Sequence, residues 1–229
     1  MRSFEISGVI VSNDDAELYD WFGIENTSPK MLKDFLSESG GDDVIITINS
    51  GGGDLYSGVN MHDTLKAYSG DVEIHICGLA ASAASIIAMA GRCLMSPGSN
   101  IMIHNAACTD CSNKNGKVKI AKDLAVTDRG IAAVYEAKSG KSSDEILKLM
   151  DRETWLDAKT ALEMGLIDGI LGSGGAGNMP DTQITNSAAN ILPRSVLDKA
   201  RVMLANERSK RKTGMKIDSL YYRLELLRR

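Results

Sequence analysis

Three short stretches carry residue types that together could perform nucleophilic catalysis. Ser82 lies in Gly-Leu-Ala-Ala-Ser-Ala-Ala-Ser, where a strand rich in Ile runs into a helix that begins with small residues. His104 follows Ile-Met-Ile, so a strand would deliver it as a general base. Gly51, Gly52 and Gly53 follow another β-branched stretch, and their N–H groups could bind a developing oxyanion.

Each stretch also has a simpler interpretation. The serine motif is typical of a buried helix start rich in Ala and Ser, and it lacks the usual Gly-x-Ser-x-Gly pattern. The glycines favour a tight turn between strand and helix. They do not form a phosphate loop, because no Gly-Lys-Ser/Thr follows, and Tyr56 stands where a dinucleotide fingerprint needs its third glycine. An isolated histidine at a strand end is more often structural than catalytic.

A catalytic histidine needs an acid to orient it, and two residues compete for this role. Asp151 and Glu153 lie together in Asp-Arg-Glu-Thr-Trp-Leu. Carboxylates before a helix often cap it or face water, so both remain alternatives. The other two histidines are less suitable as the base, because His62 falls in the helix after the glycines and His75 lies within a strand.

The elements that must position these residues alternate between strand and helix. The spacing of apolar residues and the residues that begin or end helices predict the elements. Strands are expected at 4–11, 44–49, 72–77, 93–95, 101–103, 154–156 and 167–171, and helices at 28–37, 54–68, 80–90, 114–138, 142–150 and 158–164. This order predicts an α/β fold with largely parallel strands.

The ordered motifs resemble one family closely. Ile-Asn-Ser-Gly-Gly-Gly, Gly-Leu-Ala-Ala-Ser-Ala-Ala, Met-Ile-His-Asn and Trp-Leu-Asp-Ala-Lys-Thr-Ala-Leu-Glu-Met-Gly-Leu-Ile-Asp are similar to the signatures of the Clp protease proteolytic subunit. The resemblance covers about residues 5–171. It implies a crotonase-like fold of repeated ββα units with a helical handle, for which 114–138 is the matching segment.

The resemblance also implies roles for single residues. Ser82 stands at the nucleophile, His104 at the general base, and Gly53 and Ala83 at the oxyanion hole. Glu153 stands where the family usually has Asp, which leaves Asp151 as an alternative acid. The family further implies a serine endopeptidase that acts on protein or peptide substrates, forms a homo-oligomeric ring and needs no metal or cofactor for the peptide bond cleavage.

Three features depart from the family pattern. Gly51 replaces the family's Pro, the first strand begins almost at the N-terminus, and a basic tail follows the peptidase motifs. Residues 194–229 have a charge balance of +7, against −11 for the rest. Such a chain is similar to phage and prophage head-maturation proteases, which implies capsid or scaffold proteins as substrates. A general protein-degrading subunit working with an ATPase remains an alternative.

We therefore expect a peptidase domain at 1–171, a flexible linker at 172–193 and a helical basic tail at 194–229. The tail would be either a solvated extension or a binding site for an acidic scaffold, capsid interior or nucleic acid. No apolar stretch approaches the roughly 20 residues of a membrane span, and no signal peptide is evident, which favours the cytoplasm. Cys108 and Cys111 form a lone CxxC, which favours reduced thiols over a zinc site.

Three rival functions remain open at this stage. A crotonase-type acyl-CoA enzyme would use the glycine loop but would not need Ser82 and His104. A non-catalytic Clp-like assembly protein would tolerate the change to Glu153. A Ser-Lys peptidase would be expected with a membrane segment.

Overall fold

The computed structural model describes residues 2–108, 113–172 and 191–212. A seven-stranded sheet forms its centre, and the predicted α/β class is confirmed. Its strands are β1 (Arg2–Ser7), β4 (Val44–Ser50), β5 (Val72–Ala81), β6 (Arg92–Met95), β7 (Asn100–Ile103), β8 (Thr154–Asp157) and β9 (Gly169–Ile170). The order β1-β4-β5-β6-β9 is parallel throughout, while β7 pairs with β5 in parallel and with β8 in antiparallel fashion.

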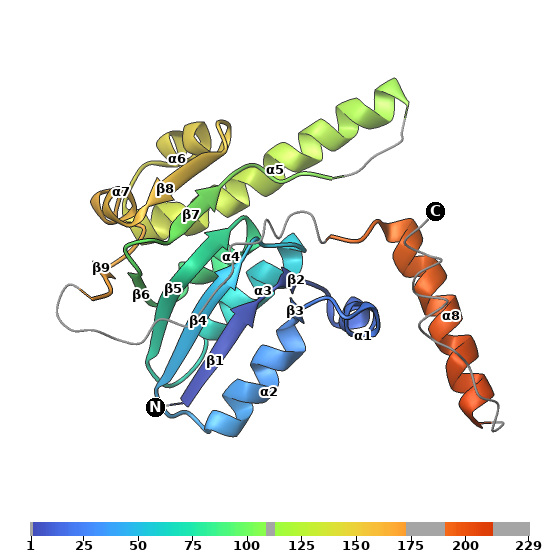
Figure 1. Ribbon diagram of the computed structural model, residues 1–229. Helices are drawn as coiled ribbons and strands as arrows, with labels where there is room; N and C mark the ends of the chain where they lie inside the picture. Colours follow the sequence, from blue (N-terminus) through green and yellow to red (C-terminus); the bar gives the residue numbers. More distant parts are fainter. Residues whose placement is uncertain (1, 109–112, 173–190, 213–229) are drawn as a thin grey trace.

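Helices cover the sheet and extend beyond it (Figure 1). They are α1 (Asn13–Phe22), α2 (Pro29–Ser39), α3 (Leu55–Lys66), α4 (Ala83–Ala88), α5 (Lys114–Ser139), α6 (Ser143–Met150), α7 (Ala158–Glu163) and α8 (Arg194–Lys212). The main core lies between the sheet and α2 to α7, where the alternate side chains of β4, Val44, Ile46 and Ile48, are fully buried. Burial of such aliphatic side chains supplies most of the stability of the fold.

The first strand ends earlier than the sequence predicts. The expected strand at 4–11 is divided at Gly8 into β1 and the short β2 (Val9–Ile10), which pairs with β3 (Asn26–Thr27). Gly8 has φ 65°, and a Cβ atom there would lie 2.1 Å from the carbonyl oxygen of Glu25. Only glycine fits this close approach of two backbones.

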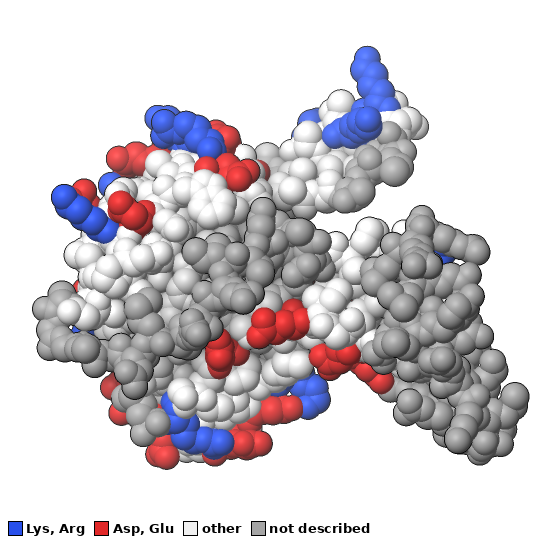
Figure 2. Space-filling model, in the orientation of Figure 1, with Lys and Arg blue, Asp and Glu red and all other residues white. Residues whose placement is uncertain are grey.

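Two helices extend beyond the sheet in Figure 1. Helix α5 projects from the body as a long arm whose buried side chains, Ile131, Ala132 and Tyr135, all lie in its second half. Helix α8 lies beside α1. Figure 2 shows Asp, Glu, Lys and Arg spread over the body, with basic side chains gathered at the outer end of α5.

Candidate active site

Ser82 occupies a strained turn between β5 and α4. Its backbone angles are φ 54° and ψ −125°, and its side chain makes no capping bond to the helix. The Ser82 N–H donates to the carbonyl oxygen of Met102 at 2.9 Å, which ties the turn to β7. A serine held at a sharp strand-to-helix turn presents its hydroxyl away from the backbone, as nucleophilic serines require.

His104 lies beside Ser82 because their strands are neighbours. β5 and β7 pair in parallel, with Ala81 opposite Met102, so both chains leave the sheet at the same edge. The Nε2 atom of His104 lies 2.7 Å from the Ser82 Oγ. This hydrogen bond allows the imidazole to take the hydroxyl proton and so activate the oxygen as a nucleophile.

Gly53 and Ala83 line the same cleft as Ser82, and their backbone N–H groups have no hydrogen-bond acceptor among the described residues. The adjacent amides are occupied, since Ser82 donates to Met102 and Asp54 donates to the carbonyl oxygen of Ile10 at 2.8 Å. Ala83 begins α4, where N–H groups lack an intrahelical acceptor. A free pair of donors beside a nucleophile can stabilise an oxyanion.

The glycine loop reaches this position only because it lacks side chains. Gly53 has φ 150°, and a Cβ there would lie 2.1 Å from the Ile10 oxygen. At Gly52, with φ 93°, a Cβ would lie 2.8 Å from the Cβ of Ser82. The loop therefore packs directly against the serine turn, and the interpretation of the glycines as a close-approach loop is consistent with this geometry.

The two predicted acids differ in their surroundings. Both are exposed. Asp151 accepts a hydrogen bond from the Asn105 Nδ2 atom at 2.8 Å. Within the described part of the chain, no carboxylate forms an ion pair with His104, although His62 pairs with Asp63 and His75 with Glu73. The identity of the third residue therefore stays a prediction.

The strand pairing gives Glu153 some support as the partner of His104. The antiparallel register of β7 and β8 ends with Ile103 opposite Thr154, and His104 and Glu153 are the next residues beyond this pair on the two chain segments. Ser82 and Glu153 (φ 48°) are also the two non-glycine residues with positive φ in the described chain. Strain of this kind concentrates at functional sites.

A pair of hydrogen-bonded hydroxyls next to Ser82 was not predicted from the sequence. The Ser85 Oγ donates to the carbonyl oxygen of Ser82 at 2.6 Å and lies 2.7 Å from the Tyr135 hydroxyl. Because the one hydroxyl hydrogen of Ser85 goes to the Ser82 carbonyl oxygen, the Tyr135 hydroxyl is the donor in the second bond. Burial also raises the pKa of Tyr135. This chain of bonds connects α5 to the serine turn. No local pattern in the sequence indicates this pair, because 50 residues separate the two hydroxyls.

A cleft of about 580 Å³ opens over the serine and histidine. Its wall is mostly apolar and comes from the glycine loop, α3, α4, β7 and α5, and it includes Ile191 from the C-terminal segment. Such a cleft can hold an extended peptide with apolar side chains against Ser82.

Of the described cysteines, Cys108 lines the cleft, whereas Cys77 and Cys93 lie outside its lining. Cys93 is buried, which raises its pKa to about 12, and Cys108 is exposed. Cys111 lies outside the described residues. No group of His, Cys, Asp and Glu in the described chain could hold a metal ion. Nor does any described helix combine the length and apolar composition that crossing a membrane requires.

Comparison with known proteins gives consistent matches. The family model described as Clp protease matches residues 26–174. The ATP-dependent Clp protease proteolytic subunit 1 of Protochlamydia amoebophila is 35% identical over 138 residues, which cover 58% of this chain and 67% of the relative. The ATP-dependent Clp protease proteolytic subunit of Bacteroides fragilis (strain YCH46) is 33% identical over 156 residues, covering 64% and 68%.

A solved structure matches as well. A mutant of ClpP1 from Listeria monocytogenes superimposes with a TM-score of 0.60 at 27% identity, covering 76% of this chain and 92% of that one. The matched residues 26–174 contain Ser82, His104 and Glu153. They leave out α1 and α8.

Proposed function

The chain belongs to the Clp protease family, and on this premise we propose that it is a serine endopeptidase with Ser82 as nucleophile and His104 as general base. The observation that carries the proposal is the 2.7 Å hydrogen bond between the His104 Nε2 and the Ser82 Oγ, at a serine with strained backbone angles. An acyl-CoA enzyme would have no need of this pair.

The reaction follows from the positions of these groups. His104 takes the proton of the Ser82 hydroxyl as the oxygen attacks a peptide carbonyl, and the N–H groups of Gly53 and Ala83 stabilise the oxyanion. The imidazolium then gives its proton to the departing amine. Water, activated by the same histidine, hydrolyses the acyl-enzyme and restores the serine.

We assign the third position to Glu153. Its carboxylate would accept the Nδ1–H of His104 and stabilise the imidazolium. The register of β7 and β8 and the left-handed backbone at Glu153 support this assignment, while the bond of Asp151 to Asn105 gives that alternative acid a different partner.

Cleavage of a model protein tests the proposal. Purified protein is incubated with an unfolded protein or a peptide mixture, and mass spectrometry identifies the products. We expect new termini with the wild-type chain and none with Ser82→Ala. Cleavage that continues in Ser82→Ala would overturn the assignment.

Two substrate classes follow from different observations. The basic segment beyond the family-matched residues supports processing of phage scaffold or capsid proteins during prohead maturation. The names of the relatives, which are ATP-dependent proteolytic subunits, support general protein degradation with an ATPase partner. Co-expression with capsid and scaffold proteins, compared with digestion in the presence of a Clp-type ATPase with and without ATP, separates the two.

Assembly and compartment are part of the same proposal. We expect a homo-oligomeric ring in which α5 contributes to contacts between subunits, because Val118 and Val126 on this helix are more than half exposed. Light scattering measures the mass of the assembly. A cytoplasmic location is consistent with the proposed substrates, and the peptidase reaction itself needs no cofactor.

A further inference from the structure

Two segments outside the family-matched residues pack against each other. Helix α1 precedes that region, α8 follows it, and together they bury a second core separate from the main one. From α8, Leu197 is 5% exposed and Ala200 is fully buried. They join Leu18, Tyr19 and Trp21 of α1 in this cluster. The described part of the C-terminal segment is therefore anchored to the peptidase domain.

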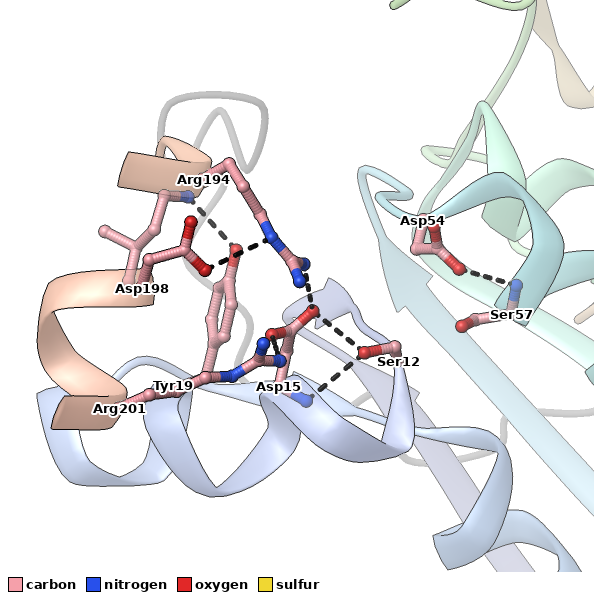
Figure 3. Close-up of polar contacts among 9 residues, drawn as sticks. Ser12, Asp15, Tyr19, Asp54, Ser57, Arg194, Asp198 and Arg201 are labelled. Carbon is pink, nitrogen blue, oxygen red and sulfur yellow. Dashed lines mark hydrogen bonds and ion pairs between the residues drawn. The ribbon is translucent and has the colours of Figure 1, made fainter. Parts of the chain in front are cut away.

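A buried carboxylate fixes the register of this contact (Figure 3). Asp15 of α1 is 8% exposed and accepts hydrogen bonds from Arg201 at 2.6 Å and from Arg194 at 3.4 Å, both from α8. Ser12 also donates to Asp15, at 2.8 Å. A carboxylate removed from water needs such partners, so a shift of α8 along α1 would leave Asp15 unpaired.

The same contact holds the chain at the entrance of the cleft. The N–H of Leu192 donates to the Tyr19 hydroxyl at 3.0 Å (Figure 3). The preceding residue, Ile191, is 52% exposed and lines the cleft that contains Ser82 and His104. Tyr56, at 72% exposure, lines this cleft too. Two large exposed apolar side chains therefore belong to the wall of one cleft.

We propose that α1 and α8 form an accessory unit that holds Ile191 in the substrate-binding wall, where it selects peptides with an apolar side chain at that position. The inference rests on the proposed peptidase function. Its physical basis is that exposed apolar surface is unfavourable in water. An apolar substrate side chain that covers Ile191 and Tyr56 removes this surface from water and so gains binding free energy. Asp15 acts as a positioning residue for this wall, since it touches α8 and not the cleft.

A matched pair of substitutions separates substrate selection from general effects on the C-terminal helix. Ile191→Ser removes the apolar side chain at the cleft, and Val202→Ser makes a comparable change on α8 at a residue that is 63% exposed and outside the cleft lining. The readouts are kcat and KM on a peptide library and the labelling rate of Ser82 with a fluorophosphonate.

We expect Ile191→Ser to lower kcat/KM about five- to tenfold, mainly through KM, and to reduce the preference for apolar residues. The labelling rate of Ser82 in the Ile191→Ser protein should match the wild type. The kcat, KM and labelling rate of Val202→Ser should match the wild type as well. An unchanged cleavage profile in a normally labelled Ile191→Ser protein would overturn the inference. Absence of both labelling and cleavage in the wild type would instead remove the proposed function, and the inference with it.

The positioning role has its own test. Asp15→Asn keeps the shape of the side chain but loses its charge, so α8 should detach more readily. In a Trp155→Phe background, Trp21 alone reports on the contact by its fluorescence. We expect a red shift of emission together with a rise in KM like that of Ile191→Ser. A red shift without any change in KM would show that the anchor serves stability alone.

Discussion

Ser82 has backbone angles that its residue type disfavours, and the surrounding structure compensates for them. The turn is fixed by the bond of its N–H to Met102 and by the bond of its carbonyl oxygen to Ser85. Its hydroxyl is hydrogen-bonded to the Nε2 atom of His104. Ser82 and His104 could be selected as candidates from the sequence because each follows an apolar strand, although neither motif was decisive without the other.

The acid is the least determined member of the site, and a pair of isosteric substitutions assigns it. Glu153→Gln should lower kcat by about a thousandfold or more, because a triad without its carboxylate leaves the imidazolium unsupported. Asp151→Asn should change kcat by much less, since its partner is Asn105. Steady-state kinetics on one peptide measures both. The reverse order of effects would assign the role to Asp151.

At the scale of elements, the Ser85–Tyr135 pair joins α5 to the turn at Ser82. Ser85→Ala leaves the buried Tyr135 hydroxyl without an acceptor and should lower the free energy of unfolding by about 1–3 kcal/mol. Tyr135→Phe removes the donor and should cost about 1 kcal/mol. Urea denaturation measures both changes.

The double variant is the control for this pair. Ser85→Ala combined with Tyr135→Phe removes both hydroxyls, so its loss of stability should be smaller than the two single losses together. Strict additivity would show that the two hydroxyls are not coupled. A loss of peptidase rate in Ser85→Ala would further show that the bond to the Ser82 carbonyl helps to hold the turn.

Helices and strands with a clear period could be predicted from the sequence, as β4 and α5 illustrate. The helix α1 could not, because its buried face, Asp15, Leu18, Tyr19 and Trp21, includes an acid and has its partner in α8. The break at Gly8 was also missed, since it depends on the approach of Glu25 from another segment.

At the scale of the whole molecule, Asp168 connects the end of α5 to the edge of the sheet. Burial raises the pKa of Asp168. The N–H of Cys93 and the ammonium group of Lys138 together lower this pKa by more than burial raises it, so the net shift is downward from 3.8. The carboxylate is thus favoured by folding. Its contribution is present above about pH 4 and is lost as the pH falls through the lowered pKa.

Asp168→Asn should therefore lower the free energy of unfolding by about 1 kcal/mol at pH 7, a modest value because the Asp168 side chain is 42% exposed. The difference from the wild type should shrink toward pH 3. Denaturation curves at several pH values measure it. A difference that stays constant from pH 7 to pH 3 would contradict this account of Asp168.

The arrangement of the whole chain could be predicted only in part. The order of elements indicated a parallel sheet, and the structure confirms the α/β fold. The basic tail at 194–229 was expected to be helical, and α8 is a helix; the part of the tail beyond residue 212 lies outside the described residues. The contact of α8 with α1 had no local signal, since Asp15 and Arg201 are 186 residues apart.

The central claim is that Ser82 is a nucleophile activated by His104, and covalent labelling tests it most directly. The protein is treated with a fluorophosphonate, and peptide mapping by mass spectrometry locates the adduct. We predict a single adduct on Ser82, which is lost in Ser82→Ala and forms far more slowly in His104→Ala. An unlabelled Ser82 in folded wild-type protein, or equal labelling of the His104→Ala protein, would contradict the claim.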